Sequence, residues 1–204
     1  AARPGTPQRD VQKLVGMLLW LSRTARPDLA VAASALGSRV ATWDEACERE
    51  LARTVGYVAA TRTQSLEQRW RVGAQPVWCL DTDADWEAPR SQSGFVVALL
   101  DNEELGRESP ESLICVHWGS KKQAYTAESA AAAECVAAHL GLREALPLHS
   151  SWQASCAPTD ADGAGASSIV MRVDNAQIVA LASHGTSEKL EFIAKASNVR
   201  LGVM

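Results

Sequence analysis

The hydrophobic pattern of the chain changes at Pro76, and this change constrains the fold more than any other feature. Before Pro76, apolar residues recur at three- and four-residue intervals, which is the period of an amphipathic helix. After it, apolar residues come in short runs separated by polar turns, as in the strands of a sheet. We therefore predict a helical domain over residues 1–72 and an α/β domain over residues 73–204.

Three helices are expected in the first domain. Pro27 should begin the second, because proline is favoured in the first turn of a helix. Thr42 and Glu45 match a capping box, which should begin the third. Trp20 should lie on the buried face of the first. The expected ranges are 8–21, 27–40 and 42–60.

Four strands and one long helix are expected in the second domain. The Ala-rich segment 127–146 should form the long helix, because Ala, Leu and Glu favour helices. Residues 158–167 are rich in Gly, Ala, Ser and Asp and should form a loop. Two further helices are expected at 175–182 and 187–197. With strands at 77–83, 94–100, 113–118 and 169–173, the order predicts a mixed sheet and an α/β fold.

Three carboxylates occupy positions from which one site can form. Asp83 follows an apolar strand, Glu134 lies within the expected long helix, and Asp174 ends the last strand. Asp83 and Asp174 come side by side if their strands are parallel neighbours. Carboxylates are the ligands that Mg²⁺ prefers, and two such ions assist phosphodiester cleavage. Each residue also has a simpler interpretation: a turn residue, a solvated helix residue and a helix N-cap, respectively.

Several motifs recur in an order that resembles a known family. They are Arg26 to Ala30 in the first domain, then Arg90 to Phe95, His117 to Gln123 and the pair Asp174 and Asn175. Together they resemble the C-terminal end of the reverse transcriptase and the ribonuclease H domain of copia-type LTR retrotransposon polyproteins. The resemblance covers the chain from about Val11 to Lys195.

The resemblance implies a ribonuclease H-like fold and hydrolysis of the RNA strand of RNA–DNA hybrids with two Mg²⁺ or Mn²⁺ ions. It makes Asp83, Glu134 and Asp174 both the catalytic and the metal-binding residues. The implied partners are an RNA–DNA hybrid or other nucleic acid and the rest of the polyprotein. The candidates for substrate binding are Lys121 and Lys122, which equally suit a plain solvated turn, and Ser93 and Asn175.

The chain departs from the family pattern in three places. Residues 131–133 are alanines, where the family carries a further acid. Residues 189–191 differ from the family's His-Ile-Asp segment, and Glu191 there is a weaker candidate for a replacement ligand than for a surface residue. The family's last strand, and the helix with a fourth acid, should follow Arg200, so we expect a C-terminally truncated domain.

These departures leave alternatives open. One is a degenerate, non-catalytic remnant that binds nucleic acid without cleaving it. Another, less favoured, is a DNA-cutting transposase or integrase of the same superfamily.

The cysteines and the absence of long apolar runs bear on location. Five Cys without a C-x-x-C pair favour reduced thiols inside a cell. No apolar run is long enough to span a membrane, and the first seven residues lack the apolar core of a signal peptide. We therefore expect an intracellular protein, cytoplasmic or nuclear and not secreted, without a membrane partner. The net charge of −4 does not indicate a dedicated DNA-binding domain.

Overall fold

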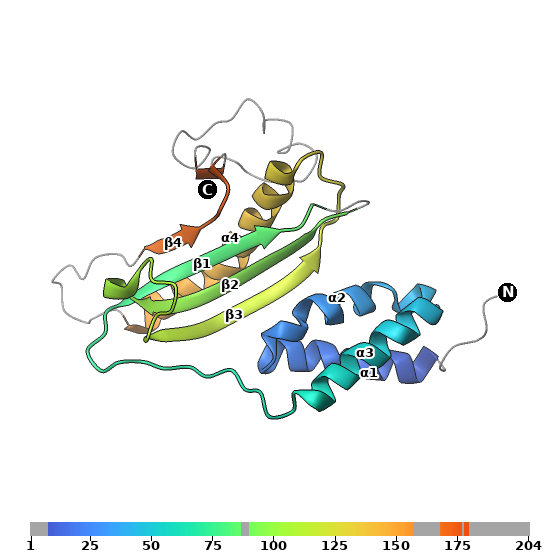
Figure 1. The fold of residues 1–204 in the computed structure, drawn as a ribbon. Helices are drawn as coiled ribbons and strands as arrows, with labels where there is room; N and C mark the ends of the chain where they lie inside the picture. Colours follow the sequence, from blue (N-terminus) through green and yellow to red (C-terminus); the bar gives the residue numbers. More distant parts are fainter. Residues whose placement is uncertain (1–7, 87–89, 157–167, 177, 180–204) are drawn as a thin grey trace. The chain divides into compact units, whose positions relative to one another are not determined.

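The computed structural model describes residues 8–86, 90–156, 168–176 and 178–179 (Figure 1). Contacts divide the chain into two compact units, one of Ala1–Glu67 with Gly119–Lys122 and one of Gln68–Trp118 with Gln123–Met204. The first unit contains the N-terminal helices, and the second contains most of the sheet and the long helix. The predicted loop at 158–167, the predicted helix at 187–197 and Glu191 lie outside the described residues.

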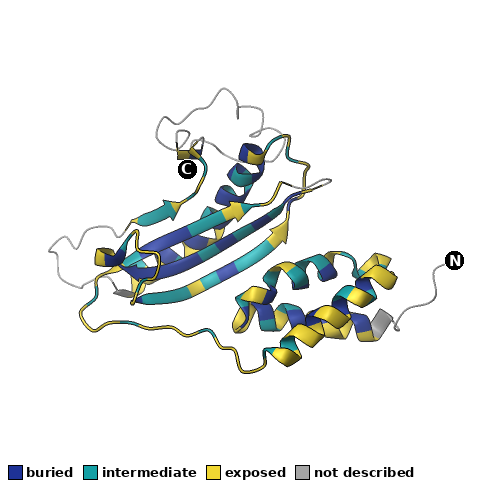
Figure 2. Ribbon diagram, in the orientation of Figure 1, coloured by how far each residue is buried: buried dark blue, intermediate teal, exposed yellow. Residues whose placement is uncertain are grey.

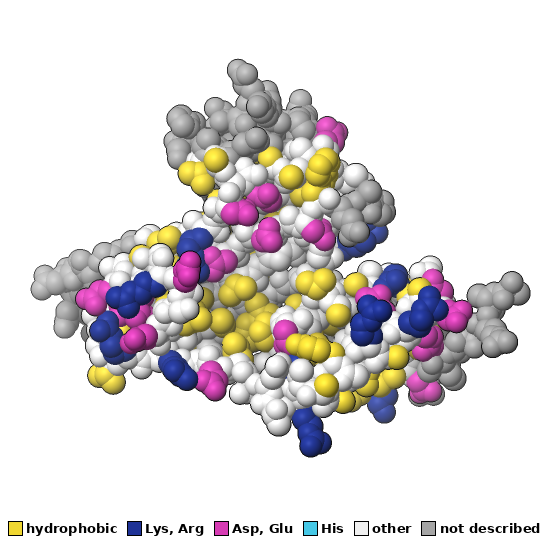
Figure 3. Space-filling view, viewed as in Figure 1, with side chains coloured by type: hydrophobic (Ala, Val, Ile, Leu, Met, Phe, Trp, Pro, Cys, Tyr) yellow, Lys and Arg dark blue, Asp and Glu magenta, His cyan; other side chains and the backbone are white. Residues whose placement is uncertain are grey.

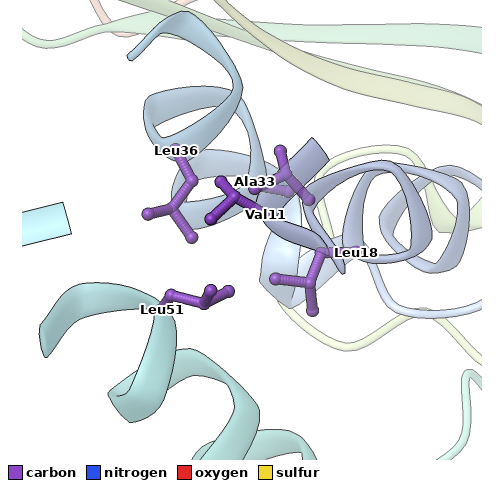
Figure 4. Close-up of a cluster of buried hydrophobic side chains, with 6 residues drawn as sticks. Val11, Leu18, Ala33, Leu36 and Leu51 are labelled. Atoms are coloured by element: carbon purple, nitrogen blue, oxygen red, sulfur yellow. The ribbon is translucent and has the colours of Figure 1, made fainter. Parts of the chain in front are cut away.

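Three α-helices form the first unit: α1 (Gln8–Thr24), α2 (Ala30–Ser38) and α3 (Glu45–Ala60). Val11 and Leu18 recur on one face of α1 and are buried, whereas Trp20 is 68% exposed, so its predicted burial is wrong. Trp20 lies two residues beyond Leu18, which turns it away from the buried face. Figure 4 shows the core side chains pointing toward one another: Val11, Leu18, Ala33, Leu36 and Leu51.

The third helix begins later than predicted. The carboxylate of Asp44 accepts a hydrogen bond from the backbone N–H of Cys47 at 2.8 Å and caps the helix. Thr42 belongs instead to a short 3-10 turn, η2 (Val40–Thr42). The predicted capping box is therefore wrong, because an Asp side chain two residues further on satisfies the free N–H groups of the first turn.

Arg26 holds the first unit together at the start of a second 3-10 turn, η1 (Pro27–Leu29). Its buried guanidinium donates two hydrogen bonds to Asp28 and two more to Thr61, which follows α3. The pairing with Asp28 raises the pKa of Arg26, although burial opposes it. The Arg-Pro-Asp motif therefore ties the end of α1 to the end of α3.

The second unit is built on a four-stranded sheet in the order β3-β2-β1-β4 (Figure 1). β1 pairs with β2 in antiparallel and with β4 in parallel orientation. The strands are β1 (Pro76–Ala84), β2 (Gln92–Asp101), β3 (Leu113–Lys122) and β4 (Ile169–Arg172). The predicted α/β fold with a mixed sheet is thus confirmed.

The long helix α4 (Ala130–Cys156) covers one face of this sheet. Gly141 allows the close approach, since a Cβ there would lie 2.6 Å from the Cγ2 of Thr82 and 3.0 Å from a methyl group of Leu80. Figure 2 shows the central strands and the facing side of α4 as largely buried. The core between them contains Trp78, Leu80, Phe95, Val97, Leu99 and Ala145.

α4 runs ten residues beyond its predicted end, although Pro147 lies inside it. A proline removes one backbone hydrogen bond and favours a break. Past Pro147, however, the helix packs His149 and Trp152 edge-on against Trp78, with ring centroids 5.7 Å and 6.0 Å apart. Among the described helices, none is long and apolar enough to cross a membrane.

Candidate functional site

The parallel pairing of β1 and β4 brings Asp83 and Asp174 to the same end of the sheet. The paired residues run from Trp78 with Ile169 to Asp81 with Arg172. Asp83 and Asp174 each come two residues after this last pair. Asp83 still pairs with Gly94 of β2, whereas Asp174 follows the end of β4. Both side chains are exposed. The sequence predicted that Asp83 and Asp174 lie side by side if their strands are parallel neighbours. The structure contains this parallel pairing of β1 and β4.

A bidentate ion pair fixes the register just before the two acids. The Nε and an Nη atom of Arg172 each donate a hydrogen bond of 2.6 Å to the carboxylate of Asp81. This pairing raises the pKa of Arg172. Two parallel N–H···O bonds also give the contact a defined geometry. Because β4 has only four residues, a cross-strand contact of this kind helps to specify which residues pair.

Glu134 approaches the same place from the first turns of α4. One of its oxygens, Oε2, is buried and has no hydrogen-bond partner among the residues that the structure describes. Burial raises the pKa of Glu134, and the negative charges of Asp174 and Asp83 raise it further. A hydrogen bond from the Asn175 side chain partly offsets this rise. The structure therefore brings Asp174 and Asp83 within electrostatic reach of Glu134.

The alanines at the start of α4 contribute to the contact between this helix and the end of β4. Ala131, Ala132 and Ala133 are all buried, and the first two pack in a cluster with Ile178. Ser129 caps this turn, since its hydroxyl accepts a hydrogen bond from the N–H of Ala132. Small side chains allow the helix to lie close to the strand, which holds Glu134 near Asp174.

The three carboxylates suit a divalent cation by their chemistry. Asp and Glu oxygens are hard ligands of the kind that Mg²⁺ and Mn²⁺ prefer, and the orphaned oxygen of Glu134 lacks a partner that a cation would supply. Within the described residues, no three or more His, Cys, Asp or Glu side chains are arranged closely enough to hold a metal ion as they stand. The residue types fit such an ion, and coordination would require the side chains to draw closer.

The four candidates for substrate binding differ in their exposure and in their contacts. Lys121 and Lys122 end β3 and are exposed. Ser93 is 1% exposed, and its hydroxyl accepts a hydrogen bond from the side chain of Gln123. Its contact with substrate stays a prediction. The side chain of Asn175 lies beside Glu134, where its hydrogen bonding lowers the pKa of that carboxyl. On the face shown in Figure 3, acidic and basic side chains are interspersed.

Sequence analysis missed the part that Gln123 plays. Its buried amide also donates a hydrogen bond to the carbonyl of Ala133, the residue before Glu134. The sequence offers one signal, a polar residue directly after a strand and shortly before the expected helix. That pattern is typical of turns in general, so it could not single this residue out.

These features define an α/β protein whose mixed sheet carries Asp83 near the end of β1 and Asp174 just after β4, with Glu134 on the covering helix. No family model and no solved structure matches the chain. It is 31% identical over 138 residues to secreted RxLR effector protein 161 of Plasmopara viticola, a match that covers 66% of this chain and 87% of that protein. The chain belongs to the family of this effector protein.

This relationship corrects two expectations from the sequence. The sequence predicts a retrotransposon polyprotein with reverse-transcriptase and ribonuclease H domains, located inside the cell. The protein that shows the family is named a secreted effector. The assignment to a retrotransposon, with its reverse transcriptase and ribonuclease H, therefore gives way to membership of this family, and the exclusion of secretion is wrong.

The cysteine argument for an intracellular location fails for a physical reason. Cys47, Cys79, Cys115 and Cys135 are free thiols in the structure. Burial raises the pKa of the Cys135 thiol to about 11, and it also raises the pKa of the other three. Because the thiolate is the reactive form, such thiols resist oxidation by remaining protonated. Their reduced state therefore does not identify a compartment.

Proposed function

We propose that Asp83, Glu134 and Asp174 bind divalent cations, Mg²⁺ or Mn²⁺, and that the site hydrolyses the RNA strand of RNA–DNA hybrids. The observation that carries the proposal is the buried, unpartnered oxygen of Glu134 beside the charges of the two Asp residues. A ribonuclease H-like version of the observed α/β fold, with two cations, is part of this proposal.

The chain's own residues have distinct parts in this mechanism. A pair of bound cations would supply relief of negative charge at the leaving oxygen and activation of the attacking water. Asp83 and Asp174 would hold the cations from the sheet, and Glu134 would hold them from α4. Asn175, whose hydrogen bonding lowers the pKa of Glu134, would orient that carboxylate. Lys121 and Lys122 would contact substrate phosphates, which positions a duplex without reading its bases.

Cleavage of a labelled RNA–DNA hybrid tests the proposal. We expect the chain to cut the RNA strand with Mg²⁺ or Mn²⁺, and we expect Asp83→Asn to abolish cutting because it removes a ligand charge. Glu111→Gln is the matched control, since it neutralises an exposed acid close to the start of β3. Cutting by wild type and Asp83→Asn alike would show contamination and contradict the assignment. Hybrid binding without cutting would support the non-catalytic alternative.

Thermal unfolding gives a second test of the cation site. Carboxylates of like charge repel one another, so a bound cation should stabilise the folded chain. At 100 times its dissociation constant, a ligand of the native state adds about 2.7 kcal/mol. We expect Mn²⁺ to raise the melting temperature of wild type and of Glu111→Gln, but not that of a chain in which Asp83 and Asp174 are both changed to Asn. Equal shifts in all three would contradict the site.

We also propose that the chain acts outside the cell that makes it, as the name of its Plasmopara viticola relative states for that protein. The family relationship is the observation that favours this second property. Detection of the full-length gene product in the culture medium, beside an intracellular marker protein, tests it. Retention of the product with the marker would contradict secretion.

A further inference from the structure

The described residues include one side chain that links the strand pair carrying Asp83 to the helical turn carrying Glu134. Gln123 follows β3, is 5% exposed, and donates two hydrogen bonds from a single nitrogen. One goes to the Oγ of Ser93 at 2.9 Å, and the other goes to the carbonyl of Ala133 at 2.8 Å. The backbone N–H of Gln123 also donates to the carbonyl of Ser91 at 2.8 Å.

Both ends of this link lie next to a carboxylate of the candidate site. Ser93 precedes Gly94, which is the residue of β2 that pairs with Asp83. Ala133 precedes Glu134 along α4. A rigid amide between the two therefore relates the position of one acid to that of the other. Because all of these groups are buried, their hydrogen bonds do not exchange readily with water.

We infer that Gln123 is a positioning residue, which sets the separation between Asp83 and Glu134 by tying the start of α4 to β2. The effect of Gln123 on cation binding rests on the proposed function. The link that Gln123 makes between α4 and β2 does not depend on that function. Gln123 has no need to touch a cation or a substrate. Without the amide, the first turn of α4 is held by the Ser129 cap and by the packing of its alanines.

Two variants separate this role from a general contribution to stability. Gln123→Met keeps the length of the side chain but removes the donor, and Gln123→Asn keeps the amide but shortens its reach. Ser112→Ala is the matched control, because it removes a buried hydroxyl that accepts a hydrogen bond from the N–H of Arg71, close to the start of β3. If Gln123→Met fails to fold, Gln123→Asn carries the test.

The first measurement is amide hydrogen exchange of the metal-free chain. We expect exchange in residues 133–137 to accelerate about tenfold in both Gln123 variants, which is the scale of losing one buried hydrogen bond. Exchange in residues 142–148 should remain as in wild type, and Ser112→Ala should leave residues 133–137 unchanged. Acceleration throughout α4, or none at all, would overturn the tie.

The second measurement is Mn²⁺ binding, followed by the electron paramagnetic resonance signal of the free ion. We expect both Gln123 variants to bind Mn²⁺ about tenfold more weakly than Ser112→Ala does, on the same scale of one hydrogen bond. Equal affinities in the three variants would overturn the positioning role. Absence of Mn²⁺ binding by wild type would instead overturn the proposed function. The exchange measurement would still show whether Gln123 ties the start of α4 to β2.

Discussion

Glu134 is the residue at which burial and charge conflict most directly. Its carboxylate is partly buried, one oxygen lacks a partner, and two further negative charges lie nearby. Burial, and after it the charges of Asp174 and Asp83, raise the pKa of Glu134 above its ordinary value. The charged form is thus less favourable in the folded chain than in the unfolded chain. A residue that destabilises the fold in this way is typical of a binding site, where a ligand later compensates for it.

The pH dependence of stability should reveal this conflict. With a raised folded pKa, the contribution of Glu134 is fully present below the unfolded value, 4.5, and is lost as the pH rises through the folded value. Glu134→Gln, which carries no charge, should therefore be more stable than wild type at pH 7 by on the order of 1 kcal/mol. The difference should vanish below pH 4.5. Urea unfolding of both proteins at pH 4 and pH 7, without metal, measures it.

The matched control for this prediction is Glu111→Gln. Glu111 is exposed, so its neutralisation should change stability little at either pH. A Glu134→Gln variant that is less stable than wild type at pH 7 would show that the Glu134 carboxylate makes a favourable contact which outweighs its burial and the nearby charges.

At the residue scale, the sequence predicted the positions of the acids but not the residues that hydrogen-bond near them. Asp83 and Asp174 stand beside apolar runs that predict strands, so their positions followed from the pattern. Their metal-binding role stays a prediction. Gln123 and the pair of Asp81 with Arg172 could not be found in this way, because each acts through a partner at least ten residues distant. The spacing of apolar residues along the sequence indicates which side chains are buried. It does not indicate which polar side chains form hydrogen bonds with residues far along the chain.

At the scale of elements, the approach of α4 to β1 depends on Gly141. A Cβ at this position would come within 3.0 Å of both Thr82 and Leu80, closer than packed side chains tolerate. The helix therefore lies against the strand at a distance that only glycine permits. This close packing fixes the height of α4 above the sheet, and with it the height of Glu134.

A pair of glycine substitutions tests this packing. Gly141→Ala should destabilise the chain by about 1–3 kcal/mol, because overpacking outweighs the gain in helix propensity. Gly56→Ala is the matched control in α3, where nothing lies within 4 Å of an added Cβ. It should stabilise the chain by about 1 kcal/mol through helix propensity alone. Thermal unfolding measures both, and stabilisation by Gly141→Ala would contradict the close approach.

The elements themselves followed from the sequence, while their ends often did not. The four strands and the long helix appear in the predicted order, because their apolar runs are long and distinct. The end of α4 was missed because packing against Trp78 outweighs the effect of Pro147. The start of α3 was missed because Thr42 and Asp44 both suit an N-cap, and only the structure shows which one accepts the bond.

At the scale of the whole molecule, each compact unit has a hydrophobic core of its own. The helical unit is built around Leu36 and its neighbours, and the sheet unit is built around Leu80 and its neighbours. Each of the buried clusters in the described residues consists of side chains from one unit. Independent cores are the condition under which parts of a chain unfold separately.

Truncation of one core should therefore leave the other intact. Leu36→Ala should destabilise the helical unit by about 2–5 kcal/mol, since Leu36 is fully buried and the change leaves a cavity. Amide exchange should then accelerate in α1, α2 and α3 while the protected amides of β1 and β2 remain unchanged. Leu80→Ala, which is equally buried in the sheet unit, should give the reverse pattern. If either variant accelerated exchange equally in both units, the chain would have to unfold as a single cooperative body, and the cation site would then depend on the helical unit for its stability.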